Sequence, residues 1–131
     1  MKHVRAAVTA LGLTLSLGVC AAPAASATEP VGNLTLDVKS LVTFRVQEVT
    51  LTCEPTGGDH PDAEAACADL IAANGDISAI PPVSASCLAY SPVAVAAVGT
   101  WAGQSDGYAG TFASWCAADA ATGGHVFNFN R

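Results

Sequence analysis

Hydrophobic and polar residues alternate in two stretches of the chain, over residues 34–39 and again over residues 49–53. A period of two is typical of strands that bury one face and leave the other in water. The sequence therefore predicts two strands early in the folded domain.

A helical period replaces this alternation after residue 60. Pro61 suits a first helical position, and Gly75 suits the C-terminal end of a helix. The apolar positions between them follow the i, i+3, i+4, i+7, i+8 spacing of one helical face. They are Ala63, Ala66, Cys67, Leu70 and Ile71. We expect a helix that carries Cys67 on its buried face.

The second half of the chain predicts a loop followed by a hairpin. Residues 77–86 contain prolines and serines with little periodicity, which indicates an irregular segment. Residues 93–101 favour a strand, a turn is expected over 103–107, and residues 108–112 alternate as the returning strand.

The C-terminal region predicts two further short elements. The alanine-rich residues 117–121 precede Gly123-Gly124 and favour a short helix. Residues 126–129 favour a last strand. The sequence shows no internal repeat and no linker after residue 27, so we expect one domain.

The N-terminal residues are typical of a secretory signal peptide. Basic residues precede an apolar run over residues 6–22, and Ala25-Ser26-Ala27 offers small residues for cleavage. We predict a signal peptide over residues 1–27, a mature domain over residues 28–131 and an extracellular location. A retained membrane anchor is disfavoured because small and polar residues interrupt the run. Lipid modification of Cys20 is disfavoured because Val19 precedes it.

Cysteine content agrees with export. Removing residues 1–27 from the 131-residue chain leaves 104 residues and the cysteines Cys53, Cys67, Cys87 and Cys116. An even number in an exported domain of this size predicts two disulfides, and the spacing alone leaves three pairings open. The nearest two cysteines lie 14 positions apart, which argues against a zinc site.

The mature chain is acidic. It carries Lys39, Arg45 and Arg131 against eleven aspartates and glutamates, a formal net charge of −8. Nucleic acids and anionic membranes call for basic patches, so neither is an expected partner. A basic partner would suit this charge, but solubility accounts for it more simply.

The sequence contains no recognisable catalytic motif. The mature histidines are His60 and His125, and neither accompanies a recognisable nucleophile motif. We interpret His60 as a helix-entry residue. Paired acid–base carboxylates are a possible reading of Asp59, Asp62 and Glu64, but acidic residues are expected in a first helical turn because of the helix dipole. The sequence therefore predicts no enzyme, no metal and no cofactor.

The segment CLAYSPV, residues 87–93, fits neither an amphipathic helix nor an alternating strand. Its residues alone predict a surface loop held by a disulfide at Cys87 and stiffened by Pro92.

Three segments together resemble the Streptomyces subtilisin inhibitor family. They are VTLTCEPTGGDHPDAEAACADL (residues 49–70), CLAYSPV (87–93) and GTWAGQSDGYAGTFASWCAADAATGGHVFNF (99–129). The resemblance spans roughly residues 34–129.

This resemblance implies a fold, a disulfide pairing and a function. The fold is α+β, in which an antiparallel sheet of about five strands carries two helices. The pairing is Cys53 with Cys67 and Cys87 with Cys116. In this family the segment after the third cysteine is an exposed loop that enters a serine protease as a substrate does and is cut very slowly. The implied function is inhibition of subtilisin-like or chymotrypsin-like serine proteases.

The implied reactive-site loop consists of Cys87, Leu88, Ala89, Tyr90, Ser91 and Pro92. It is one residue shorter than is usual in the family. Alignment on Tyr90 and Pro92 places the scissile bond between Leu88 and Ala89, whereas alignment on Cys87 places it between Ala89 and Tyr90. The alternative function is a secreted binding protein of the same fold whose shortened loop has lost inhibition.

A two-fold homodimer is also expected. The family implies it, and the apolar residues of the strand that begins at Val93 leave little polar surface on either face.

Overall fold

The computed structural model describes Gly18 and residues 28–129. The predicted signal peptide lies outside the described residues, Gly18 excepted, and stays a prediction. None of the helices in the described part of the chain is both long and apolar enough to span a membrane.

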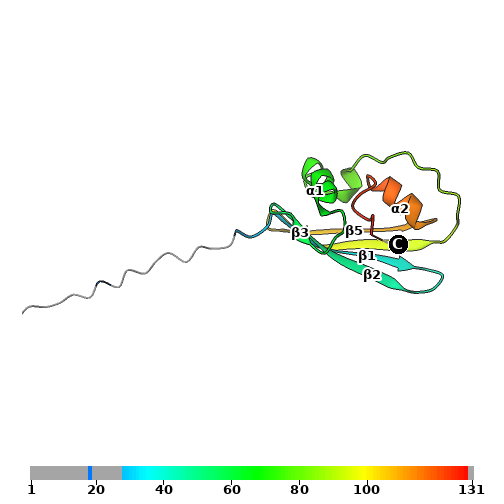
Figure 1. Cartoon of the computed structure of the whole chain (residues 1–131), viewed down its shortest axis with the longest axis horizontal. Helices are drawn as coiled ribbons and strands as arrows, with labels where there is room; N and C mark the ends of the chain where they lie inside the picture. Colours follow the sequence, from blue (N-terminus) through cyan, green and yellow to red (C-terminus); the bar gives the residue numbers. More distant parts are fainter. Residues whose placement is uncertain (1–17, 19–27, 130–131) are drawn as a thin grey trace, which may run out of the picture.

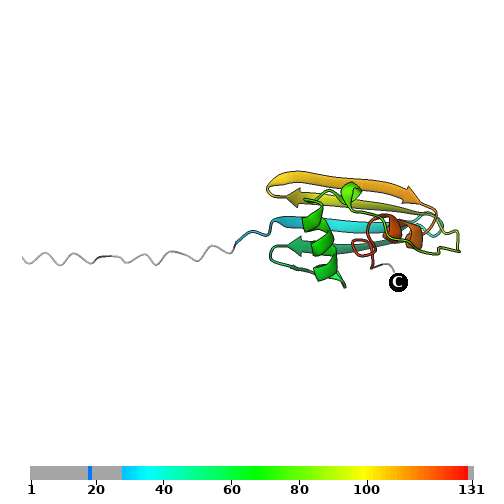
Figure 2. The ribbon, with the colours of Figure 1, turned by 90° about the horizontal axis from the view of Figure 1, so that it is seen from above.

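The centre of the fold is a five-stranded antiparallel sheet with the order β3-β2-β1-β4-β5 (Figures 1 and 2). Its strands are β1 (Gly32–Ser40), β2 (Val46–Cys53), β3 (Gly57–Gly58), β4 (Val93–Trp101) and β5 (Gln104–Phe112). Strand β1 lies in the middle and pairs with β2 on one side and β4 on the other. The two predicted early strands and the predicted hairpin are therefore confirmed.

Helices cover one face of the sheet and leave the other face open (Figure 1). They are α1 (Ala63–Ala72), the 3-10 helix η1 (Ile77–Ala79) and α2 (Trp115–Ala121). The alternating residues Leu34, Leu36 and Val38 of β1 point to the covered face and are buried. This arrangement confirms the predicted α+β fold with two α-helices.

Two predicted boundaries were wrong. The β4–β5 turn consists of Ala102 and Gly103, not of residues 103–107, because Trp101 already pairs with Gln104. Both turn residues have positive φ, 49° and 77°, as a type I′ hairpin turn requires. Helix α1 begins after Asp62, so Pro61 lies outside it.

Helix α1 buries a narrower face than its sequence predicts. Ala66, Cys67 and Leu70 are buried, whereas Ile71 is 44% exposed. Gly75, with φ of 82°, ends the helix by donating its N–H to the Leu70 carbonyl at 2.8 Å. Its left-handed conformation costs a glycine little, which explains the residue type.

The first disulfide joins the sheet to helix α1. Cys53 at the end of β2 is bonded to Cys67, and both residues are buried. Closing a loop of this length removes chain entropy from the unfolded state and contributes roughly 3 kcal/mol. The second disulfide joins Cys87 to Cys116, so the structure contains both predicted pairs.

The predicted last strand over residues 126–129 is wrong, because this segment forms turns over the helix-covered face. Val126 and Phe127 are fully buried there. The Phe127 ring lies 6.1 Å from that of Tyr108, and the Phe129 ring lies 5.6 Å from that of His60. Burial, not strand pairing, explains the apolar pattern, and the fifth strand of the sheet is the short β3.

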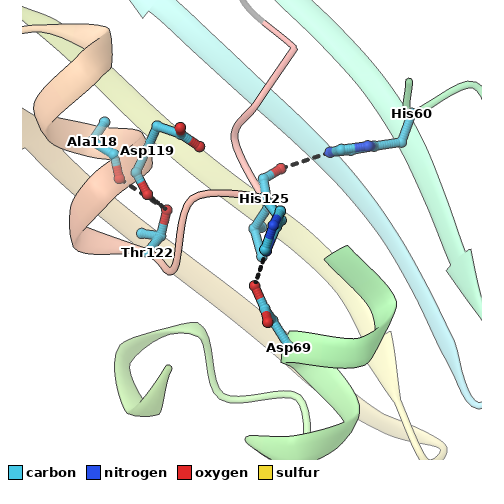
Figure 3. A network of polar contacts seen from close by, with 7 residues as sticks. His60, Asp69, Ala118, Asp119, Thr122 and His125 are labelled. Carbon is cyan, nitrogen blue, oxygen red and sulfur yellow. Dashed lines mark hydrogen bonds and ion pairs between the residues drawn. The ribbon is translucent and has the colours of Figure 1, made fainter. Parts of the chain in front are cut away.

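Side-chain donors, in place of a neighbouring strand, bond the backbone carbonyls of this C-terminal segment (Figure 3). His60 Nε2 donates to the Val126 carbonyl at 2.8 Å, while His60 Nδ1 accepts from the Asp62 N–H at 3.0 Å. Trp115 Nε1 donates to the Phe127 carbonyl at 2.7 Å. The buried carbonyls of an irregular segment are thereby satisfied.

His125 holds the same segment against α1 by an ion pair. Its Nδ1 lies 2.8 Å from Asp69 Oδ2, and the carboxylates of Asp62 and Asp119 are also near. The hydrogen bond to Asp69 raises the pKa of His125 above its ordinary value of 6.5, with smaller contributions from the neighbouring charges. Because the folded pKa exceeds the unfolded one, the pair stabilises the fold most at pH values below the unfolded pKa.

We predict that replacing His125 by glutamine destabilises the protein more at acidic than at alkaline pH. The loss should be at most about 1 kcal/mol near pH 5.5, because the pair is partly exposed, and it should shrink as the pH rises through the folded pKa of His125. Urea unfolding of both proteins at about pH 5.5 and about pH 9 measures this difference. Asp69→Asn should show the same trend, and a loss independent of pH would contradict the assignment.

Candidate functional site

The candidate site is the long loop that connects η1 to β4. Residues 81–92 form neither helix nor strand. In Figure 1 this loop passes over the helices and then descends at one end of the sheet into β4. Leu88 is 95% exposed and Tyr90 is 80% exposed, although both are large apolar side chains. Surface of this kind at a loop indicates a binding function.

Covalent and hydrogen bonds fix the loop on both sides of this exposed stretch. The disulfide of Cys87 with Cys116 holds its start against the first turn of α2. Immediately after the exposed stretch, the Ser91 N–H donates to the Ala113 carbonyl at 2.9 Å. Leu88, Ala89 and Tyr90 therefore lie between two fixed points.

Helix α2 provides a firm attachment for the disulfide. The Ser114 hydroxyl caps the helix by accepting from the Ala117 N–H at 3.1 Å. Next to the cap, the Trp115 indole bonds the C-terminal segment. The position of Cys116 is thus determined by packing around α2, and the disulfide transmits this constraint to Cys87.

The loop is also held upstream. The Val83 N–H donates to the Ala120 carbonyl of α2 at 2.8 Å. Pro81 and Pro82 precede it, and their rings restrict φ. A loop restrained at several points loses little conformational entropy when a partner binds it.

The loop carries no charged side chain. Residues 77–105 contain no aspartate, glutamate, lysine, arginine or histidine. Among the described residues, no three His, Cys, Asp or Glu side chains are grouped as a metal site would require. The large side chains that the loop exposes are apolar or aromatic: Val83, Leu88 and Tyr90.

The acidic residues considered for acid–base chemistry have structural positions. Asp59 Oδ1 accepts from the N–H of Thr50 at 2.6 Å and from its hydroxyl at 2.9 Å. The backbone hydrogen bond from Thr50 is the main cause that lowers the pKa of Asp59. Asp59 thus bonds strand β2 and does not lie in the first helical turn, which corrects the sequence-based interpretation.

The other two acidic residues lie nearer to the helix. Asp62 is the N-cap residue of α1, without a side-chain cap bond, and Glu64 lies in the first turn as expected. His60 precedes α1, as predicted, and the structure further shows that its side chain is buried.

Sequence reasoning missed the hairpin turn between β1 and β2, which lies beside the loop. The Leu41 N–H donates to the Pro92 carbonyl at 2.9 Å. Val42 and Phe44 are exposed apolar residues of this turn. Their presence between two strands, where polar turn residues are usual, was the available sequence signal.

The sequence and the fold both resemble those of known proteins. The sequence model of a family described as subtilisin inhibitor-like matches residues 31–114, which include the whole loop. A chain from the crystal structure of Streptomyces caespitosus sermetstatin in complex with Bacillus licheniformis subtilisin superimposes with a TM-score of 0.57 and 27% identity. This match covers 75% of the present chain and 97% of that chain.

Curated relatives agree with this match. Subtilisin inhibitor-like protein 3 of Streptomyces coelicolor is 45% identical over 87 residues, which are 64% of this chain and 80% of that protein. Subtilisin inhibitor-like protein 4 of Streptomyces lavendulae is 47% identical over 85 residues, which are 62% of this chain and 72% of that protein.

Proposed function

The chain belongs to the subtilisin inhibitor-like family, and on this premise we propose that it inhibits subtilisin-like serine proteases by presenting residues 87–92 as a substrate-like loop. The observation that carries the proposal is the exposed stretch from Leu88 to Tyr90 between two fixed points. No catalytic residue or cofactor of the chain itself is needed for this activity.

The restraints on the loop account for inhibition instead of digestion. When a protease serine attacks the scissile carbonyl, the amine of the following residue is the leaving group. The bond from Ser91 to Ala113 and the pairing of β4 hold that amine near the acyl group, while the Cys87–Cys116 disulfide holds the other side. Re-formation of the peptide bond is then favoured because both reacting groups stay in place.

We assign the scissile bond to Leu88–Ala89. Leucine buries much more apolar area in a specificity pocket than alanine does. Tyr90, Pro92 and the strand that follows are the alignment anchors for this register. The alternative bond, Ala89–Tyr90, places an alanine in the pocket and one more residue between the disulfide and the cleavage point.

The proposed place of action is extracellular. The predicted signal peptide would export the chain, and two disulfides suit an oxidising compartment. Secreted subtilisin-like or chymotrypsin-like proteases are the proposed partners, since both classes accept a leucine.

We further propose a two-fold homodimer that forms through the open face of the sheet. Small residues and one oppositely charged pair of side chains line a shallow hollow there: Asp37, Lys39, Ala94, Ala96, Ala109 and Thr111. On the same face Val98 is exposed. Two such flat faces can pack closely around a symmetry axis.

The first prediction is that the mature protein inactivates subtilisin in a titration that reaches completion near one loop per protease molecule. Residual hydrolysis of a small peptide substrate measures the active fraction. Subtilisin that stays fully active with excess protein would contradict inhibition and favour a binding protein that has lost it. Incubation with ordinary protein substrates checks that the chain has no protease activity of its own.

The second prediction concerns the specificity of the loop. Leu88→Lys should improve trypsin inhibition by on the order of 100-fold, because trypsin pairs a basic side chain with the aspartate of its pocket. Inhibition constants for trypsin and subtilisin measure the change, and Ala89→Lys is the matched control. If Ala89→Lys produces the shift instead, the scissile bond is Ala89–Tyr90.

The third prediction concerns the dimer. Ala96→Glu should weaken association by on the order of 100-fold, because each added carboxylate lies beside Asp37 and would be buried in the proposed interface. Sedimentation at micromolar concentration measures the effect. Ala68→Glu, on the exposed side of α1, is the matched control and should leave the dimer intact. A wild-type protein that sediments only as a monomer would contradict the proposal.

A further inference from the structure

A second exposed apolar surface lies beside the reactive-site loop. It is the turn between β1 and β2, residues 41–45, which we term the β1–β2 turn. Val42 is 61% exposed and Phe44 is 69% exposed, and Leu41 is also at the surface. Figures 1 and 2 both place this turn at the end of the sheet where the loop enters β4.

Hydrogen bonds connect the two surfaces directly. Ser40 pairs with Val93, and the Leu41 N–H donates to the Pro92 carbonyl at 2.9 Å. The β1–β2 turn therefore adjoins the residues that follow either candidate scissile bond. A protease that holds these residues in its cleft would lie close to Phe44.

The conformation of Phe44 is unusual for its residue type. Its φ is 59°, in the left-handed region that glycine and asparagine adopt most readily. The bond from its N–H to the Ser40 carbonyl, 2.9 Å, and the bond from the Ser40 N–H to the Arg45 carbonyl, 2.9 Å, close the turn in this form.

Folding alone does not explain an aromatic residue here. Phe44 does not belong to the buried core. Glycine would also fit the turn without strain. An exposed aromatic residue in a strained position is typical of a binding site.

Charge distinguishes this end of the molecule as well. Lys39 and Arg45 are the only lysine and arginine among the described residues; Arg45 is the last residue of the β1–β2 turn, and Lys39 lies two residues before the turn. Lys39 Nζ lies 5.9 Å from the centre of the Phe44 ring. This end of the molecule thus combines apolar side chains with two positive charges in an otherwise acidic domain.

We propose that the β1–β2 turn is a second contact with the protease that binds the reactive-site loop. The inference rests on the proposed inhibitory function and adds a binding site to it. Phe44 and Val42 bind the apolar rim of the protease cleft, on the side that receives the residues after the scissile bond. Arg45 favours proteases that carry a carboxylate beside that rim.

The test compares the inhibition constants of the wild type and Phe44→Ala with subtilisin. We expect the constant of Phe44→Ala to rise about tenfold or more, since truncation of an aromatic anchor in an interface costs this much. Phe44→Gly should show the same rise while suiting the left-handed turn, and Phe44→Tyr should retain tight inhibition. Ile71→Ala removes an exposed apolar side chain from α1 and serves as the matched control.

The outcomes separate this inference from the proposed function. If the wild type leaves subtilisin fully active, inhibition and the second contact are both wrong. If the wild type inhibits and both Phe44 variants keep its constant within about twofold, the second contact alone is wrong. Loss of dimer in sedimentation with an unchanged inhibition constant would assign Phe44 to self-association and would also overturn the inference.

Discussion

The pairing of β1 with strands on both of its sides determines the position of every surface discussed above. Leu34, Leu36 and Val38 point to the covered face. A shift of one residue would turn all three toward water, so burial fixes the register strongly. This register sets Ser40 opposite Val93, and the chain before Val93 must therefore emerge beside the β1–β2 turn. The packing of the hydrophobic core therefore determines where the loop before Val93 lies.

The rigidity of the loop comes from the other layer of the fold. Cys116 can hold Cys87 in place only if α2 is itself immobile, and a helix of seven residues is not stable alone. The indole N–H of Trp115, the first residue of α2, donates to the Phe127 carbonyl. Phe127 is in turn buried between the helices and the sheet. A packed C-terminal segment thus supports the helix, and the helix supports the loop through one disulfide.

The period of hydrophobic residues was sufficient to predict a helix or strand where that element buries a single face. It predicted β1, β2, α1 and the β4–β5 hairpin, because their burial follows the geometry of strand or helix. It failed at residues 126–129, where the same apolar composition is buried in turns whose carbonyls accept hydrogen bonds from His60 and Trp115. Those donors lie 66 and 12 positions from their partners in the sequence, so the pattern of neighbouring residues cannot predict the hydrogen bonds.

The functional residues were predictable to different degrees for a similar reason. An exposed loop has no periodicity, so the proposal of Leu88 and Ala89 came from resemblance and from the position of Cys87. The β1–β2 turn was missed because its importance depends on the neighbouring chain at Pro92, a contact between distant residues. Asp59 was misread because its partner, Thr50, lies on a strand nine positions earlier and not on the helix that follows.

One end of the sheet contributes mainly to stability, and the other end carries the proposed binding surfaces. At one end Trp101 packs against Gly32, where the ring leaves no room for a β-carbon, and Cys53 and Cys67 are bonded nearby in the core. At the other end the large apolar side chains of the loop and the β1–β2 turn face water. Because these side chains stay in water when the chain folds, they add little to the stability of the free domain, which depends on the core and its buried disulfide. Binding a protease would remove that apolar surface from water without requiring the core to change, because the loop is already held in its exposed form.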